Sequence, residues 1–189
     1  MKEKLFIYDN LDAGNKRQAE VRFGAIEAAI QIHALPVGSK DELVRELDKL
    51  VAQRMTFERV LFQAHGNTGR LWIGQDIVRD TDWGTTFAGR NYDSLFPAFT
   101  RVYFDGCLVA GGETGTKFLE GAGKTLLRKG GGVVFASVET GQGITVGAPL
   151  VGGHTVYPRD SFEYVYFKPG GIVDRSPPLA RVAVTKLGW

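Results

Sequence analysis

The chain has 189 residues, of which 43% are hydrophobic and 23% are charged. This length and apolar content suit a single hydrophobic core, so residues 1–189 are expected to form one domain. Lysine and arginine total 23 and aspartate and glutamate total 21, which gives a net charge of +2. Such a balance gives no electrostatic reason to expect nucleic acid or a membrane surface as a partner.

Cysteine content and apolar runs indicate the compartment. Cys107 is the only cysteine, so no disulfide can form within the chain, and a lone thiol fits a reducing environment. The apolar run that ends at Asp9 is too short for a signal peptide, and no other run is long enough to cross a bilayer. A cytoplasmic location is therefore expected.

Short apolar runs alternate with amphipathic segments in the first part of the chain. The pattern predicts strands at 4–8 and 32–37 and helices from Asn15 to about Ile30 and from Ser39 to about Arg54. Ser39 stands three residues before Glu42, a spacing typical of the capping box at the start of a helix.

The same alternation continues through the middle of the chain. Further strands are predicted at 57–64, around 102–104 and at 133–137, with a helix over 117–129 and a small hairpin with loops over 66–90. Strands at 163–167 and 181–185, with a turn over 168–171, predict β-hairpins near the C-terminus. The fold class is therefore α/β, with a mostly parallel central sheet covered by helices on both faces.

Two of the predicted strands end in reactive side chains. The apolar run over 60–62 leads to His65-Gly66, and the run over 102–104 leads to Asp105-Gly106-Cys107. Sites of parallel sheets form outside the carboxyl ends of the strands. A thiol nucleophile needs a base or an imidazolium nearby, so neighbouring strand ends could hold both side chains over one substrate carbonyl.

This pattern carries a family resemblance. An apolar strand ending in His-Gly, followed by a strand ending in a small residue and Cys107, which lies 42 residues after His65, resembles the signature of caspase-like cysteine peptidases. That clan includes caspases, metacaspases and gingipains. The segment 111–119, the helix and glycine break after it and the strand 133–137 are similar to CHAT-type and metacaspase-like members. The similarity covers about residues 57–138, and the part from Glu139 onward matches no pattern of the clan.

The resemblance implies a caspase-like three-layer sandwich and a hydrolase that acts on a polypeptide substrate without a cofactor. It assigns His65 as general base or acid and Cys107 as nucleophile. The backbone N–H groups of Gly66 and Cys107 would face the oxyanion. The clan is usually described as using a dyad, so no third catalytic residue is implied.

The aspartates near these strand ends bear on specificity. In metacaspases, which resemble this chain at Asp105, the aspartate two residues before the nucleophile lines a pocket for a basic side chain. Asp9 or Asp12 could add a second carboxylate at the same edge, and charge-assisted hydrogen bonds would then favour arginine or lysine. The alternative is that Asp105 caps a loop and that Asp9 and Asp12 are solvated.

The sequence gives little support for a phosphate-binding loop or a metal site. Residues 121–125 look like part of a phosphate-binding loop, but Phe118 occupies the position of a required glycine and the segment has helical periodicity. Three histidines and one cysteine without a close pair of ligands give no support for a metal site.

Two alternatives to an active peptidase stay open. One is a catalytically inactive caspase-like module that binds a partner protein or a peptide strand. The other is a self-cleaving domain of the bacterial toxin type, activated by inositol hexakisphosphate, which the stretches 65–70 and 87–91 resemble although no strong basic cluster is visible. The activating ligand, if there is one, is not indicated by the sequence.

Overall fold

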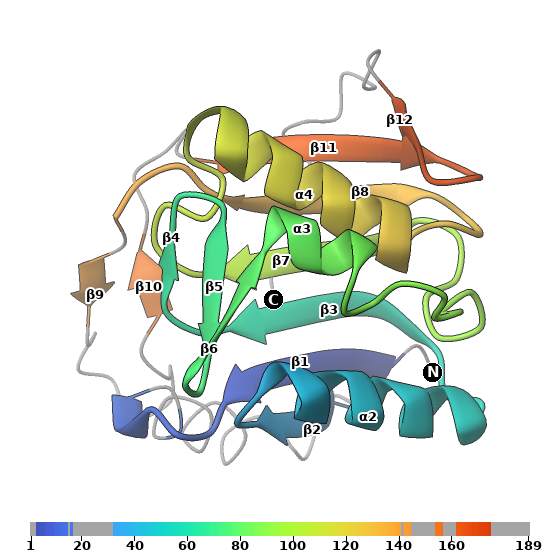
Figure 1. Ribbon diagram of the computed structural model, residues 1–189, viewed down its shortest axis with the longest axis horizontal. Coiled ribbons are helices and arrows are strands. Elements are labelled where there is room, and N and C mark those ends of the chain that lie inside the picture. The colour runs from blue at the N-terminus through green and yellow to red at the C-terminus, as the bar shows by residue number, and fades with distance from the viewer. Residues whose placement is uncertain are drawn as a thin grey trace.

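A computed structural model describes residues 3–14, 16, 32–140, 142–144, 154–156 and 162–174. Its main feature is a seven-stranded sheet (Figure 1). The strands of this sheet are β1 (Glu3–Asp9), β2 (Ile32–Val37), β3 (Phe57–Gln63), β7 (Thr100–Asp105), β8 (Gly132–Ser137), β11 (Phe162–Lys168) and β12 (Ile172–Asp174). Their order across the sheet is β12-β11-β8-β7-β3-β1-β2.

The pairing of the strands confirms the predicted α/β class with a mostly parallel sheet. β2, β1, β3, β7 and β8 pair in parallel with one another, in this order across the sheet. β11 and β12 add an antiparallel hairpin at one edge, which confirms the predicted turn over 168–171. A separate antiparallel pair joins β9 (Gln142–Ile144) to β10 (His154–Val156). The strand predicted at 181–185 lies outside the described residues.

The segment after β3 contains more regular secondary structure than the small hairpin with loops that the sequence predicts. It forms a three-stranded antiparallel sheet of β4 (Gly66–Asn67), β5 (Arg70–Ile73) and β6 (Asp76–Arg79), followed by the short helix α3 (Asp80–Gly84). Local periodicity does not reveal α3 because tertiary packing stabilises it. Trp83 is 3% exposed, and its ring centroid lies 5.6 Å from that of Phe118, a residue distant in sequence.

Two longer helices complete the architecture, α2 (Lys40–Ala52) and α4 (Gly112–Leu126). Ser39 caps α2 as predicted, because its hydroxyl accepts a hydrogen bond from the Glu42 N–H at 3.1 Å. The Glu42 carboxylate accepts from the Gly38 N–H at 2.7 Å, one residue earlier than in a standard capping box. α4 begins before the predicted start at residue 117, since its glycine-rich first turn lacks the periodicity that marks a helix.

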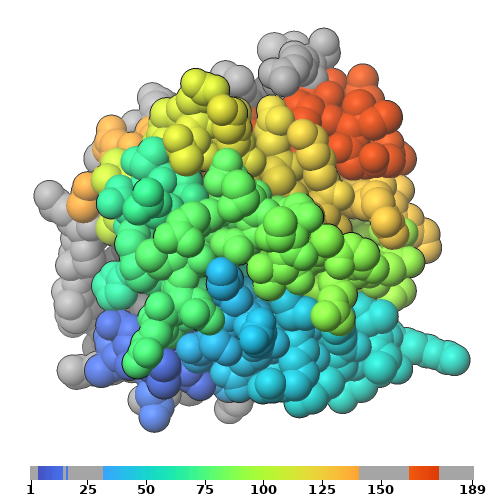
Figure 2. Space-filling view, viewed as in Figure 1, coloured from blue at the N-terminus to red at the C-terminus, as the bar shows by residue number. Residues whose placement is uncertain are grey.

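The described helices α2, α3 and α4 lie in front of the same face of the sheet (Figure 1). In the space-filling view from the same side, the parts of the chain that contain these helices form much of the visible surface (Figure 2). Strand side chains that point toward them, such as Phe62 and Phe104, belong to the main core. Alternate residues on the other face, such as Phe6 and Leu61, form a second buried cluster. The helix predicted from Asn15 to about Ile30 falls largely outside the described residues, so helical cover of this second face stays a prediction.

Phe104 lies at the centre of the main core and provides a test of the packing. It is fully buried, with its ring centroid 4.7 Å from that of Phe62 and 5.1 Å from that of Phe118. We expect Phe104→Ala to lower the free energy of unfolding by about 3–5 kcal/mol, measured by equilibrium urea denaturation. The matched control is Phe99→Ala, because Phe99 is 82% exposed and should change stability by less than about 0.5 kcal/mol. Equal losses in the two variants would contradict this description of the core.

Candidate functional site

The ends of β3 and β7 bring His65 and Cys107 to the same edge of the sheet. The parallel register pairs Gln63 with Asp105, and His65 and Cys107 each follow two residues later. The Ala64 N–H donates to the Asp105 carbonyl at 3.4 Å, which extends the contact beyond the last paired residues. The expectation that the two residues follow the carboxyl ends of neighbouring parallel strands is therefore confirmed.

Gly66 shows how closely the two chain segments approach each other. A Cβ atom at this position would lie 2.5 Å from the Val109 Cγ2 and 2.7 Å from the Cys107 carbonyl oxygen. No side chain fits in that space, so glycine is required by the close backbone approach. The His65-Gly66 segment is thus packed directly on the backbone of the Cys107 loop.

The loop that follows Cys107 is held in a strained conformation. Leu108 has φ +59°, in the left-handed region that residues other than glycine rarely adopt. Its N–H donates to the Glu139 carbonyl at 3.0 Å, and the Ala110 N–H donates to the Ser137 carbonyl at 2.9 Å. These bonds tie the loop to the end of β8, and such anchoring is what allows a strained backbone to persist.

The His65 side chain contacts a residue on the β1 side of β3, away from β7 and Cys107. Its Nε2 atom lies 3.2 Å from the Oδ2 atom of Asp12, which belongs to the loop after β1. The imidazole is 69% exposed and the Asp12 side chain 32% exposed. Asp12 is therefore a partner of His65, although the two residues are 53 positions apart in sequence.

A cavity of about 510 Å³ lies beside this pair. It is lined by the loop after β1 (Asp9, Leu11, Asp12), by His65 and Gly66, and by Trp72, Gly74 and Gln75 of the hairpin. Cys107 is not among these lining residues. The chain leaves β1 toward β2 on one side and leaves β3 toward β7 on the other, so the cavity occupies a topological switch point, the usual place of ligand sites in such sheets.

The hairpin wall of the cavity is fixed to the start of α2. Gly74 has φ +60°, and a Cβ there would collide with the Gly38 carbonyl. The Asp76 carboxylate accepts a hydrogen bond from the Lys40 N–H at 2.9 Å, at the helix N-terminus where a negative charge is favourable. These contacts hold Trp72 in the wall of the cavity.

Trp72, Gly74 and Gln75 are site residues that the sequence did not indicate. The sequence predicts only a small hairpin with loops over 66–90, and no local signal gives the position of that hairpin over the strand ends.

The candidate carboxylates take different positions. Asp9 is only 4% exposed, contributes to the cavity wall, and accepts a hydrogen bond from the Leu11 N–H at 3.0 Å. Asp105 is 6% exposed, accepts a hydrogen bond from the Tyr103 hydroxyl at 3.2 Å, and is not among the lining residues. The cavity beside His65 therefore contains Asp9 and Asp12, and the pocket role predicted for Asp105 stays a prediction.

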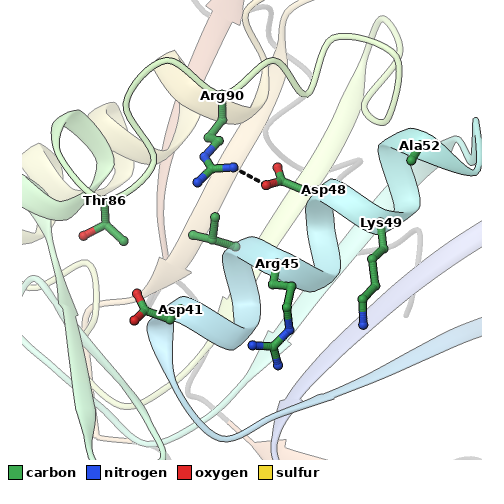
Figure 3. A pocket seen from close by; sticks show the side chains of 8 residues that line it. Asp41, Arg45, Asp48, Lys49, Ala52, Thr86 and Arg90 are labelled. Carbon is green, nitrogen blue, oxygen red and sulfur yellow. Dashed lines mark hydrogen bonds and ion pairs between the residues drawn. The ribbon is translucent and has the colours of Figure 1, made fainter.

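A second hollow, of about 550 Å³, lies between α2 and the segment 86–90 (Figure 3). Arg90 forms an ion pair with Asp48 across it, while Lys49 pairs with Glu46 on its own helix at 2.6 Å. The described residues that line this hollow include no thiol and no imidazole. This hollow therefore lacks the thiol and the imidazole of the candidate site at the ends of β3 and β7.

The described part of the chain contains no group of three or more histidine, cysteine, aspartate and glutamate side chains placed to hold a metal ion. None of its helices combines the length and apolar character needed to cross a membrane.

Comparison of the chain with models of known protein families and with curated protein sequences gives no match. The likeness to caspase-like peptidases therefore depends on the residues and spacing of the chain itself.

The contact at Gly66 can be tested by a single added methyl group. We expect Gly66→Ala to lower the free energy of unfolding by about 1–3 kcal/mol, because the new Cβ displaces the Cys107 loop. It should also change the rate at which iodoacetamide alkylates Cys107, the only thiol. Gly84→Ala is the matched control, since no atom lies within 4 Å of a Cβ placed there. Urea denaturation and alkylation rates are measured for both variants. Equal stability and equal alkylation rates in Gly66→Ala and Gly84→Ala would contradict the contact.

Proposed function

We propose that the chain is a cysteine endopeptidase in which Cys107 is the nucleophile and His65 the general base and acid. The observation that supports this best is the register of β3 and β7, which sets the two residues at the same distance beyond neighbouring strand ends. The packing of Gly66 on the Cys107 backbone adds to it, because it holds the two loops at a fixed separation.

In the proposed reaction, the Cys107 Sγ attacks the carbonyl carbon of the scissile peptide bond while His65 takes the thiol proton. The tetrahedral intermediate collapses to a thioester, and His65 gives the proton to the leaving amine. Water, deprotonated by His65, then attacks the thioester and releases the acid and the Cys107 thiol. No redox change or cofactor is needed.

The proposed oxyanion site uses the backbone N–H groups of Gly66 and Cys107. Two features support it. The absence of a side chain at Gly66 lets its backbone approach the backbone of the Cys107 loop closely, so the two N–H groups belong to segments in direct contact. The strained φ of Leu108, directly after Cys107, marks a sharp change of chain direction at the nucleophile, and strain of this kind is concentrated at functional sites.

The cavity beside His65 supports a preference for a basic residue at the cleavage site. It combines the carboxylates of Asp9 and Asp12 with the indole of Trp72. A guanidinium or ammonium group would gain charge-assisted hydrogen bonds from the carboxylates and a cation–π contact with the indole. An acidic substrate side chain would instead meet like charges in a partly desolvated place.

Catalytic competence is tested by thiol reactivity and peptide hydrolysis together. We expect Cys107→Ala to abolish hydrolysis, and His65→Ala to slow alkylation of Cys107 by iodoacetamide at neutral pH by about tenfold or more. His33→Gln is the control, because His33 lies on the edge strand β2 with its ring 5.8 Å from that of Phe57. If Cys107 is alkylated at the same rate in the wild type, in His65→Ala and in His33→Gln, an inactive module that binds a partner is favoured instead.

Specificity is tested with fluorogenic peptides that vary the residue before the cut. We expect arginine and lysine to be preferred, and Asp9→Asn to reduce kcat/KM for those peptides by about 30-fold, equivalent to about 2 kcal/mol of transition-state stabilisation. Neutral peptides should be affected much less. Asparagine can still accept the Leu11 hydrogen bond, so the variant removes the charge and keeps the turn.

Asp105→Asn is the comparison for that experiment, because the sequence resemblance assigned the basic pocket to Asp105. A loss of kcat/KM for arginine and lysine peptides in Asp105→Asn alone would place the basic pocket beside Asp105 and not in the cavity beside His65. A preference for acidic residues would remove both carboxylates from substrate recognition.

A further inference from the structure

The contact between Asp12 and His65 has no counterpart in the dyad that the resemblance implies. The two side chains meet through Nε2 and Oδ2 at 3.2 Å. An ionised carboxylate can only accept hydrogen bonds, so Nε2 must carry the hydrogen in this contact. The other ring nitrogen, Nδ1, is then the one that remains to exchange a proton with a thiol.

We propose that Asp12 is a positioning residue for His65, which fixes the orientation of the imidazole and reserves its Nδ1 atom for Cys107. This inference rests on the proposed peptidase function. An imidazole that is 69% exposed has little packing to restrict its rotation, so a single hydrogen bond at Nε2 has a large effect on where the ring points.

The backbone around Asp12 is itself fixed, which a positioning role requires. The Asn10 N–H donates to the Val37 carbonyl at 3.0 Å, and the Leu11 N–H donates to the Asp9 carboxylate at 3.0 Å. On the other side, the Asp12 carbonyl accepts from the Lys16 N–H at 2.9 Å. Asp12 therefore follows a segment anchored to β2, its own carbonyl closes the turn of chain to Lys16, and β1 places it on the side of β3 opposite β7 and Cys107.

Removal of Asp12 should affect the ring and leave the fold intact. Ion pairs at this degree of exposure contribute little to stability, so the melting temperature of Asp12→Ala should match that of the wild type. Asp93→Ala is the matched control, because Asp93 is 27% exposed and pairs with Arg128 at 3.0 Å. Asp12→Asn serves as the rescue, since its amide oxygen can still accept from Nε2.

The first measurement is the order of the His65 ring, from NMR relaxation of ring carbons in ¹³C-histidine-labelled protein, with His65→Gln used to assign the signal. We expect the order parameter of His65 to fall in Asp12→Ala and to remain near the wild-type value in Asp12→Asn and Asp93→Ala. An unchanged order parameter in Asp12→Ala would overturn the proposal, whatever the activity.

The second measurement is kinetic. We expect Asp12→Ala to slow Cys107 alkylation and to lower kcat for neutral peptides, which do not need the cavity carboxylates, by about tenfold with KM little changed, and Asp12→Asn to recover most of both rates. A loss that Asp12→Asn does not recover, or one expressed only in KM, would overturn the positioning role. If the wild type hydrolyses no peptide, the proposed function fails, while the ring order and the alkylation rates still decide the role of Asp12.

Discussion

The site depends on the backbone contact between the chain just after β3 and the chain just after β7. Gly66 leaves no room for a Cβ beside the Cys107 carbonyl, and a Cβ at Gly106 would lie 3.2 Å from the Gly66 Cα. Because both segments continue paired strands of one sheet, their separation is set by the ladder between β3 and β7 and not by flexible loops. The reactive residues therefore inherit the rigidity of the sheet centre. Hydrogen bonds from the Cys107 loop to the end of β8 extend the same constraint to the next strand.

A second set of constraints gives the site its other wall. Lys40, the first residue of α2, donates its backbone N–H to Asp76 of the hairpin and its Nζ to Asp82 of α3 at 3.1 Å. One residue thus connects three segments, and the hairpin between β3 and α3 is positioned over the loop after β1. The cavity lies at the carboxyl ends of β1 and β3, and this hairpin forms one of its walls. Its polar groups come from one loop and its aromatic surface from another, so neither segment alone makes the site.

Some of this arrangement was accessible from sequence because it follows from local rules. The limits of β2 and the cap at Ser39 follow from side-chain periodicity and from one hydroxyl-to-backbone hydrogen bond. The proximity of His65 and Cys107 follows from parallel strand order, which needs no knowledge of side-chain packing. The short helix α3 and the wall position of Trp72 depend on contacts between distant segments, such as that of Trp83 with Phe118. The Asp12 partnership depends on where a loop of several residues ends in space, and neither composition nor spacing carries that information.

The alternation of side chains along strands also decides how the aspartates can act. Asp9 lies two residues after Ile7 on β1, and Ile7 belongs to the core that faces the helices. Asp105 lies two residues after Tyr103 on β7, and Tyr103 packs with the cluster on the opposite face. Since every second residue of a strand points to the same face, Asp9 and Asp105 belong to opposite sides of the sheet and cannot form one carboxylate pair around a substrate side chain. Asp12 differs because it lies beyond the strand and reaches the cavity from a loop. A pair of charges for a basic residue can therefore come from Asp9 with Asp12, with the added constraint that Asp12 also serves His65. Substrate recognition and orientation of the base would then share the carboxylate of Asp12. A basic substrate side chain bound to Asp12 would therefore change the hydrogen bond that orients the His65 imidazole.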